Sequence, residues 1–319
     1  MTDTVLATND PSAAVVAKRV TLPGYDIMVG PATHLAGERQ RLDTLRFESF
    51  DVVRLGATIG AEIRGLDLRR PLTPAVVAEL GEALHAYKVV FFRDQPISAG
   101  QHVAFARCFG ELEIHPFIPS NTGVPELVRF EKTAEVAGYE NAWHHDVTWR
   151  ARPSMAAVLH ALSVPAVGGD TLFADMGAAY DGLDDTLKAR IDGLSAVHDF
   201  VRTFGRQVPP DKMAETRARY PAVEHPVVCR HAATGRRHLY VNRTFVDHVV
   251  GLDPDESLAL LDRLCRQADY PEYQCRFHWE DHSVAFWDNR MVQHYAASDY
   301  WPQSRVMERA SIVGGVPSA

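Results

Sequence analysis

With 319 residues, 46% of them hydrophobic and 23% charged, the chain has room for one large globular domain or two small ones. Its net charge of −8 and the lack of a dense Lys/Arg block argue against a nucleic-acid partner, because phosphate binding needs clustered cations. No apolar run reaches the roughly 20 residues of a membrane-spanning helix, and the first residues predict no signal peptide. The four cysteines form no CxxC pair, so we expect free thiols in a cytoplasmic protein that does not bind membranes.

Residues 1–45 show no sustained hydrophobic periodicity, which predicts a partly irregular extension in front of a single domain over residues 46–319. FDVVRL and TIGAEIRGL then predict two paired strands with Gly56 at the turn. TPAVVAELGEALHAYK predicts a helix, because Thr73 suits the N-cap and Pro74 the first helical position. KVVFF follows as a buried strand, and SAGQHVAFARCFG predicts a second helix.

Short segments rich in β-branched and aromatic residues dominate the second half of the chain. They are AAVLHAL, GGDTLFAD, HLYVN, YQCRFHW, SVAFWDN and VMERASIV. Helices interrupt them, notably DPDESLALLDRLCRQ, where Asp253 can cap and Glu256 has the capping-box position. Many short strands with few helices predict a mainly β fold with flanking helices, a sandwich or jelly-roll barrel. No GxGxxG, GxxxxGK[ST] or GxSxG motif occurs, which excludes the common nucleotide-binding and serine-hydrolase classes.

The stretch AWHHDVTWR, residues 142–150, contains the first candidate for chemistry. If it is a strand, His144 and Asp146 share one face and His145, which we interpret as structural, points to the other. An imidazole and a carboxylate on one face supply two ligands of a 2-His-1-carboxylate triad, which suits a non-haem Fe(II) oxygenase. The pattern alone leaves three alternatives, namely a metal site, a proton relay and a polar surface strand. The same spacing recurs in His278-Trp279-Glu280.

Further motifs distinguish these alternatives. WHHDVT, PAVGGDTLFADM, EHPVV, LYVNRTF, FWDNRMVQHYA and DYWPQSRVMER follow one another from about residue 46 almost to the end. In this order they resemble the taurine dioxygenase and 2,4-dichlorophenoxyacetate dioxygenase (TauD/TfdA) family of Fe(II)/2-oxoglutarate enzymes. The resemblance implies a double-stranded β-helix core of the jelly-roll, cupin-like type. It also implies Fe(II), 2-oxoglutarate and O2 as cofactor and co-substrates, and we expect a homo-oligomer, a dimer or a tetramer.

The resemblance assigns the centre of the site residue by residue. It implies that His144, Asp146 and His294 bind Fe(II). Thr171 and Arg305 would hold the distal carboxylate of 2-oxoglutarate, since a guanidinium grips a carboxylate with two hydrogen bonds and a hydroxyl adds a third. Decarboxylation would then give succinate, CO2 and an oxidant that removes a hydrogen atom from an unactivated C–H bond.

Arg309 and His115 match the family positions on the substrate side. The chain departs from the taurine enzymes in having Ile118 in place of a tyrosine. It also has Glu140, with Asn141 beside it, where they have an asparagine. A carboxylate near the pocket disfavours a bare sulfonate, so a larger or partly apolar substrate is expected. Aromatic candidates for the pocket and the adjoining core are Phe117, Phe173 and Phe245.

The first hypothesis is therefore a dioxygenase that hydroxylates a C–H bond of a small anion, after which the product breaks down. The anion would be a sulfonate, an alkyl sulfate or an aryloxyalkanoate. An alternative keeps the same cofactors but hydroxylates or desaturates an amino acid or carboxylate in a biosynthetic pathway, and Glu140 would suit an amine there. A third is a non-enzymatic jelly-roll metal-binding protein. Thr171 and Arg305 disfavour it, because a metal binder has no need to hold a dicarboxylate.

Overall fold

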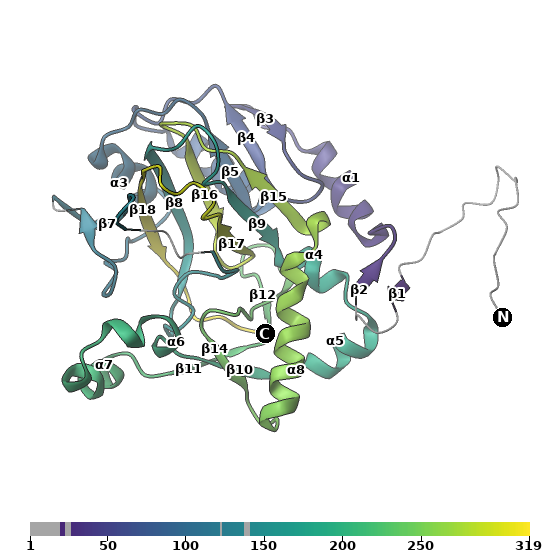
Figure 1. The fold of residues 1–319 in the computed structure, drawn as a ribbon. Coiled ribbons are helices and arrows are strands. Elements are labelled where there is room, and N and C mark those ends of the chain that lie inside the picture. The colour runs from purple at the N-terminus through teal and green to yellow at the C-terminus, as the bar shows by residue number, and fades with distance from the viewer. Residues whose placement is uncertain (1–19, 23–26, 122, 137–140) are drawn as a thin grey trace, which may run out of the picture.

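The computed structural model describes residues 20–22, 27–121, 123–136 and 141–319. Its largest sheet has eight strands and brings segments distant in the sequence side by side (Figure 1). Neighbouring strands are antiparallel, except that β4 and β5 are parallel. From edge to edge the strands are β3 (Asp51–Arg54), β4 (Ala61–Arg64), β5 (Val89–Phe92), β16 (Val284–Asp288), β8 (Ser154–Ser163), β18 (Arg305–Val313), β7 (Val124–Lys132) and β6 (Ser120–Asn121).

A three-stranded antiparallel sheet faces the large one. Its strands, in order, are β15 (Gln274–Phe277), β9 (Thr171–Asp175) and β17 (Val292–Ala296). Apolar side chains from both sheets form one buried cluster between them, in which Phe91 stacks on Phe277 with ring centroids 3.9 Å apart. Two facing antiparallel sheets with helices on the outside form a jelly-roll, so the predicted fold class is confirmed.

Two helices cover the outer face of the large sheet, and both are predicted from the sequence. They are α2 (Pro74–Tyr87) and α3 (Ala99–Arg107). The hydroxyl of Thr73 caps the first turn of α2, and Ser98 and Gln101 form a reciprocal capping box at the start of α3. The predicted strand pair is also present, because β3 and β4 are antiparallel neighbours.

The remaining elements form a second layer with its own apolar cluster. A three-stranded sheet has the order β11 (Val223–Pro226), β10 (Ser195–His198) and β14 (Val246–Val249), and β12 (Val228–Arg230) pairs with β13 (Arg237–Leu239). The helices are α4 (Met176–Asp181), α5 (Asp185–Ile191), α6 (Val201–Phe204), α7 (Met213–Arg219) and α8 (Pro254–Cys265). Asp253 caps α8 as predicted, while the side chain of Glu256 hydrogen-bonds to Arg190 of α5.

The N-terminal segment contains a helix that the sequence analysis did not predict. After the short hairpin of β1 (Val20–Leu22) and β2 (Ile27–Val29), α1 spans Ala36–Thr44. Glu38 on α1 accepts a hydrogen bond of 2.7 Å from the ammonium group of Lys88. Lys88 is only 1% exposed and lies 3.3 Å from Asp175 at the end of β9. Glu38 thereby links α1 to the buried Lys88 and, through Lys88, to the end of β9.

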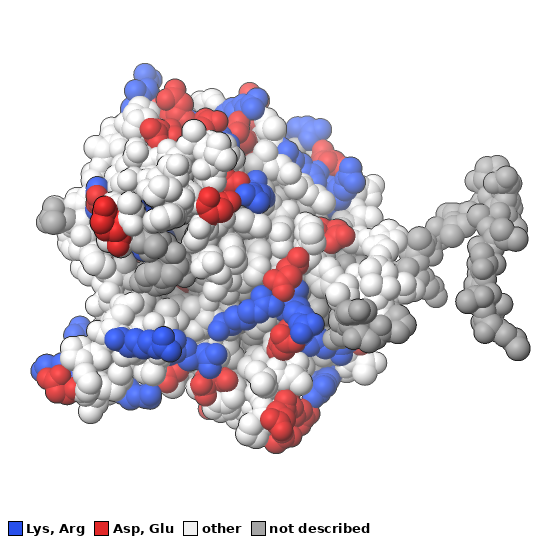
Figure 2. All heavy atoms as spheres, viewed as in Figure 1, with Lys and Arg blue, Asp and Glu red and all other residues white. Residues whose placement is uncertain are grey.

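No helix within the described ranges combines the length and apolarity needed to cross a membrane. All four cysteines are free, as the sequence predicts. Figure 2 shows basic and acidic side chains interspersed on the visible face.

Candidate active site

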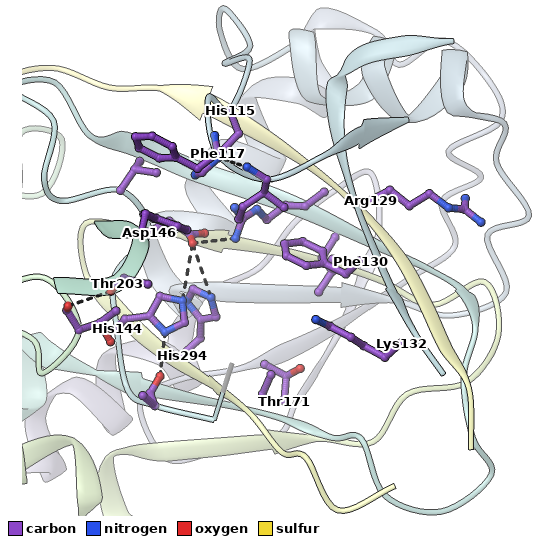
Figure 3. Close-up of a pocket in the computed structure, with 18 of the residues that line it drawn as sticks. His115, Phe117, Arg129, Phe130, Lys132, His144, Asp146, Thr171, Thr203 and His294 are labelled. Atoms are coloured by element: carbon purple, nitrogen blue, oxygen red, sulfur yellow. Dashed lines mark hydrogen bonds and ion pairs between the residues drawn. The ribbon is translucent and has the colours of Figure 1, made fainter. Parts of the chain in front are cut away.

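A cavity of about 350 Å³ opens at one end of the jelly-roll and collects most of the predicted site residues (Figure 3). Strands β7, β9, β17 and β18 supply one part of its wall, and the turn after His144 and the segments around Phe117 and Phe204 supply the rest. The predicted residues on its lining are His115, Phe117, Ile118, His144, Asp146, Thr171, Phe173, Phe245, His294, Arg305 and Arg309.

Three of these side chains converge on one point. Asp146 Oδ1 lies 3.7 Å from His144 Nε2 and 4.0 Å from His294 Nε2, and the three potential ligand atoms lie within 4.8 Å of one another. The Nδ1 atom of His144 is 2.8 Å from the carbonyl oxygen of Ala142. That contact places the proton on Nδ1 and leaves the Nε2 lone pair facing the centre. Two imidazole nitrogens and one carboxylate oxygen in this arrangement fit a divalent transition metal.

The protonation states also suit a metal. Burial would raise the pKa of the Asp146 carboxyl, but Arg309 and the two histidines lower it to about 2. Burial lowers the pKa of His294 to about 3. The carboxylate is therefore ionised and the imidazole neutral at neutral pH, and these are the forms that bind metals.

The strand considered as a hypothesis for this stretch is not formed, although its side chains point as that hypothesis expects. Only His144 forms a backbone bridge, with His294, and the chain then turns over residues 146–149. Val147 has a φ of +48°, which no strand permits. Asn289 binds the backbone of Asp146 and holds this turn. His145 points away from the centre and is fully buried against Tyr240, with ring centroids 4.9 Å apart, as its structural interpretation predicts.

Arg309 forms a buried ion pair with Asp146, a partner that the sequence analysis did not predict. Its Nη1 atom donates to Asp146 Oδ1 at 2.7 Å, and both residues are buried. The guanidinium carbon also lies 5.1 Å from the centroid of the Phe130 ring. Arg309 still lines the cavity, so it can contact both the triad and a ligand.

Thr171 begins β9 and lies at the end of the cavity away from His115 (Figure 3), and Arg305, which begins β18, also lines the cavity. Thr171 Oγ1 accepts a hydrogen bond of 2.9 Å from the indole of Trp279. Gly169 has a φ of +70°, and a Cβ there would lie 3.3 Å from Arg305, which explains the glycine of the GGDT motif. Lys132, which the sequence analysis missed, lies opposite Arg305 on β7 and also lines this end.

The other end is formed by His115 and an aromatic wall. His115 Nδ1 accepts hydrogen bonds from the backbone N–H groups of Phe117 and Ile118, at 3.2 and 3.0 Å. Burial lowers the pKa of this imidazole to about 3, so it is neutral and its remaining proton is on Nε2. The ring of Phe204 stacks on Phe117 and on Phe245, with centroid distances of 5.1 and 6.1 Å.

Some predicted residues are not brought to the cavity. Asn141 is exposed and does not line it, and Glu140 lies outside the described residues. His278 of the second His-x-acid motif binds Asp170 instead, at 2.8 Å. Lining residues that the sequence analysis missed are Arg129, Phe130, Lys132, Thr203, Phe204, Gln207 and Thr244. Arg129, Phe130, Glu131 and Lys132 of β7 all line the cavity, so period-two alternation alone would not have found Phe130 and Lys132.

A second group of potential metal ligands, His85, His231 and Asp288, has a structural explanation. His231 Nε2 lies 2.9 Å from Asp288 Oδ2, and Arg290 makes three further hydrogen bonds to the same carboxylate, one from its backbone N–H and two from its guanidinium. Asp288 is thus fully engaged by this chain's own groups.

Comparisons with known proteins agree with this geometry. The family model described as "Taurine catabolism dioxygenase TauD, TfdA family" matches residues 51–311. The alpha-ketoglutarate-dependent sulfate ester dioxygenase of Pseudomonas putida is 35% identical, over 84% of this chain and 90% of its own length. The (S)-phenoxypropionate/alpha-ketoglutarate-dioxygenase of Sphingobium herbicidovorans is 34% identical, over 83% and 96%. The crystal structure of AAD-2 in complex with Mn(II) and N-oxalylglycine superposes with a TM-score of 0.74 at 30% identity, covering 85% of this chain and all of that one.

Proposed function

This chain belongs to the TauD/TfdA family and is an alpha-ketoglutarate (2-oxoglutarate)-dependent dioxygenase, and we propose that it uses Fe(II) to hydroxylate a small organic anion with an apolar tail. The observation that carries the proposal is the placement of two sets of groups in one cavity. His144, Asp146 and His294 converge on one point, and Thr171 and Arg305 line the same cavity.

The donor set supports a metal of the Fe(II) type, since two imidazoles and one carboxylate leave positions open for ligands. When bound, the metal, 2-oxoglutarate and O2 together supply the oxidant that removes a hydrogen atom, with succinate and CO2 as products. In this proposal Arg305 holds the distal carboxylate of 2-oxoglutarate through two N–H donors. The hydroxyl of Thr171 adds a donor while it accepts from Trp279.

The substrate's anionic group binds at the opposite end in this proposal. Arg309 supplies the charge, and the Nε2–H group of His115 supplies a neutral donor. Because Arg309 is buried and His115 is half-buried, their hydrogen bonds face limited competition from water. They orient the anion so that the carbon next to it faces the triad.

The rest of the cavity supports an alkyl or aryl tail. Phe117, Phe204 and Phe245 form a continuous aromatic wall, and Ile118 offers no hydrogen bond where the taurine enzymes have a tyrosine. Among the described lining residues, the carboxylate other than Asp146 is Glu131, which pairs with Arg129 at the rim. The described lining of the cavity therefore offers no uncommitted carboxylate that could bind a substrate ammonium group. We therefore favour an alkyl sulfate or an aryloxyalkanoate over taurine or an amino acid, in keeping with the substrates that the relatives' names give.

The test is a panel of taurine, alkyl sulfates, aryloxyalkanoates and amino acids, each supplied with Fe(II) and 2-oxoglutarate. Substrate-dependent succinate release is measured, with His144→Ala as the inactive control. We expect stimulation by alkyl sulfates or aryloxyalkanoates and little by taurine. Stimulation by an amino acid alone would overturn the proposed substrate class, and no release with any anion would overturn the proposed reaction.

A further inference from the structure

The oxygen of Asp146 that faces the metal position is already bonded to a cation of the chain. Arg309 Nη1 donates to Asp146 Oδ1 at 2.7 Å, and this same oxygen faces the Nε2 atoms of His144 and His294. Both partners are at most 5% exposed, so little water screens their attraction. A metal that binds Oδ1 must therefore share the oxygen with Arg309 or displace it.

The pair is attached by a single hydrogen bond. In the described part of the chain, neither Asp146 Oδ2 nor Arg309 Nε has a hydrogen-bond partner. Arg290 and Asp288 show the contrasting arrangement, in which Nε and Nη2 of one guanidinium bind the two oxygens of one carboxylate. Two parallel bonds fix an arginine–carboxylate pair, whereas one bond leaves the guanidinium able to turn.

The surroundings allow Arg309 to turn toward the cavity. Its guanidinium lies beside the Phe130 ring, a flat apolar surface on the cavity wall. The nearby carboxylate of Glu113 is engaged by Arg150 and by the hydroxyl of Ser154, at 3.1 and 2.9 Å. Within the described residues, Asp146 is accordingly the ion-pair partner of Arg309.

We propose that Arg309 is shared between Asp146 and the anionic group of the substrate, so that substrate binding withdraws it from Asp146 and strengthens metal binding. The inference rests on the proposed function only in assuming that an anion reaches Arg309. Binding free energies are reciprocal, so the metal must strengthen substrate binding by the same factor. A residue that only contacted the substrate would not link the two ligands through Asp146.

The first arm of the test contains no substrate and no 2-oxoglutarate. The affinity for Mn(II) is measured from the electron paramagnetic resonance signal of the free ion, which involves no turnover. Arg309→Met frees Asp146 Oδ1 and should bind Mn(II) about fivefold to tenfold tighter than the wild type. Arg305→Met is the matched control, because it removes a buried cation from the same strand and cavity without touching Asp146, and it should change the affinity less than about twofold.

The second arm repeats the titration with saturating hexyl sulfate. The wild type should gain about fivefold or more in Mn(II) affinity, while Arg309→Met should gain less than about twofold. Arg309→Lys, which keeps the charge, covers the case in which the methionine variant fails to fold, and it should lie between the two. The inference would be overturned if, in the absence of substrate and 2-oxoglutarate, Arg309→Met bound Mn(II) no more tightly than the wild type. It would also be overturned if hexyl sulfate raised the Mn(II) affinity of Arg309→Met as much as that of the wild type.

The two proposals fail differently. If hexyl sulfate stimulates succinate release but leaves the Mn(II) affinity of the wild type unchanged, the sharing of Arg309 is wrong and the function stands. If no anion in the panel stimulates succinate release, the proposed function is wrong, while the ligand-free arm still decides whether Arg309 competes with the metal.

Discussion

The side-chain amide of Asn289 binds both peptide groups of Asp146. Its Oδ1 atom accepts from the Asp146 N–H at 2.7 Å, and its Nδ2 atom donates to the Asp146 carbonyl at 3.0 Å and to the Ser154 carbonyl at 2.8 Å. The next residue, Val147, has a left-handed backbone that is costly for a β-branched side chain. Asn289 thus stabilises a turn that the local sequence would not adopt by itself.

Asn289→Asp should therefore damage the metal site without changing a ligand. The substitution keeps the shape but sets a carboxylate oxygen against two carbonyl oxygens that lose their donor, at about 1–3 kcal/mol for each unsatisfied group. We expect Mn(II) affinity to fall about tenfold or more, measured by the same titration. Asn242→Asp is a control, because this buried asparagine hydrogen-bonds to Thr148 and loop N–H groups rather than to a metal ligand. Equal losses in both variants would contradict the positioning role.

Replacing any of His144, Asp146 or His294 with Ala should abolish metal-dependent turnover and weaken metal binding at least about tenfold. The matched change is His145→Ala, which removes a buried ring that faces Tyr240. It should lower the free energy of unfolding but leave the Mn(II) affinity nearly unchanged. An active His144→Ala beside an inactive His145→Ala would show that the ligands are misassigned.

Arg305→Ala should weaken 2-oxoglutarate binding by about 2–5 kcal/mol, because one side of a buried charge pair is removed. Isothermal titration of 2-oxoglutarate into the anaerobic, metal-loaded protein measures this. Arg309→Ala should largely spare it, and an unchanged affinity in Arg305→Ala would remove this residue from the co-substrate site.

Two substitutions at Thr171 test the two hydrogen bonds of its hydroxyl, and two measurements, 2-oxoglutarate affinity and melting temperature, distinguish those bonds. Thr171→Ser keeps the hydroxyl and should change little. Thr171→Val should weaken 2-oxoglutarate binding by about 1 kcal/mol. It also leaves the buried indole N–H of Trp279 without an acceptor, so the melting temperature should fall as well. A valine variant with an unchanged melting temperature would contradict the contact with Trp279.

The protein should lose stability between about pH 6.5 and pH 4. Burial lowers the pKa of His102 to about 3 and those of His160 and His238 to about 4. In this range the unfolded chain binds protons at these imidazoles and the folded one does not, so the free energy of unfolding falls as the pH falls. Each histidine contributes about 1.4 kcal/mol between pH 7.5 and pH 5.5.

The free energy of unfolding in urea, measured for the wild type and His102→Gln at pH 7.5 and at pH 5.5, checks this pH dependence. Glutamine can still donate to the Val158 carbonyl, which His102 Nε2 contacts at 3.0 Å, but it does not titrate. Its loss of unfolding free energy between these pH values should be smaller by about 1.4 kcal/mol. An identical loss in both proteins would show that His102 is protonated in the folded state.

Local patterns predicted α2, α3 and most strands of the jelly-roll, because capping residues and period-two alternation act within a few residues. They failed at Val147, where Asn289, 143 positions from Asp146, overrides the extended conformation that the segment favours. The helix α1 was missed because its stabilising contacts, such as that of Glu38 with Lys88, are tertiary. The motifs predicted His144, Asp146 and His294 as a group. The pairing of Arg309 with Asp146 depends on how β18 packs against the turn, and a local sequence pattern cannot predict such a tertiary contact.

The contact of Lys88 with Glu38 means that the N-terminal segment contributes to the stability of the fold, although it does not line the cavity. Cutting the chain after residue 45 would remove Glu38 and leave an interior ammonium group with Asp175 as its remaining described carboxylate. Because Asp175 and the Thr58 carbonyl still contact Lys88, the loss should be smaller than the about 3–5 kcal/mol of a buried charge left without a partner, yet it counts against the roughly 5–15 kcal/mol that keeps a domain folded. Proteolysis between α1 and β3 would therefore lower the yield of folded enzyme, although the cleaved chain would keep every residue that lines the cavity. An affinity tag should be added in front of α1 and should not replace this helix.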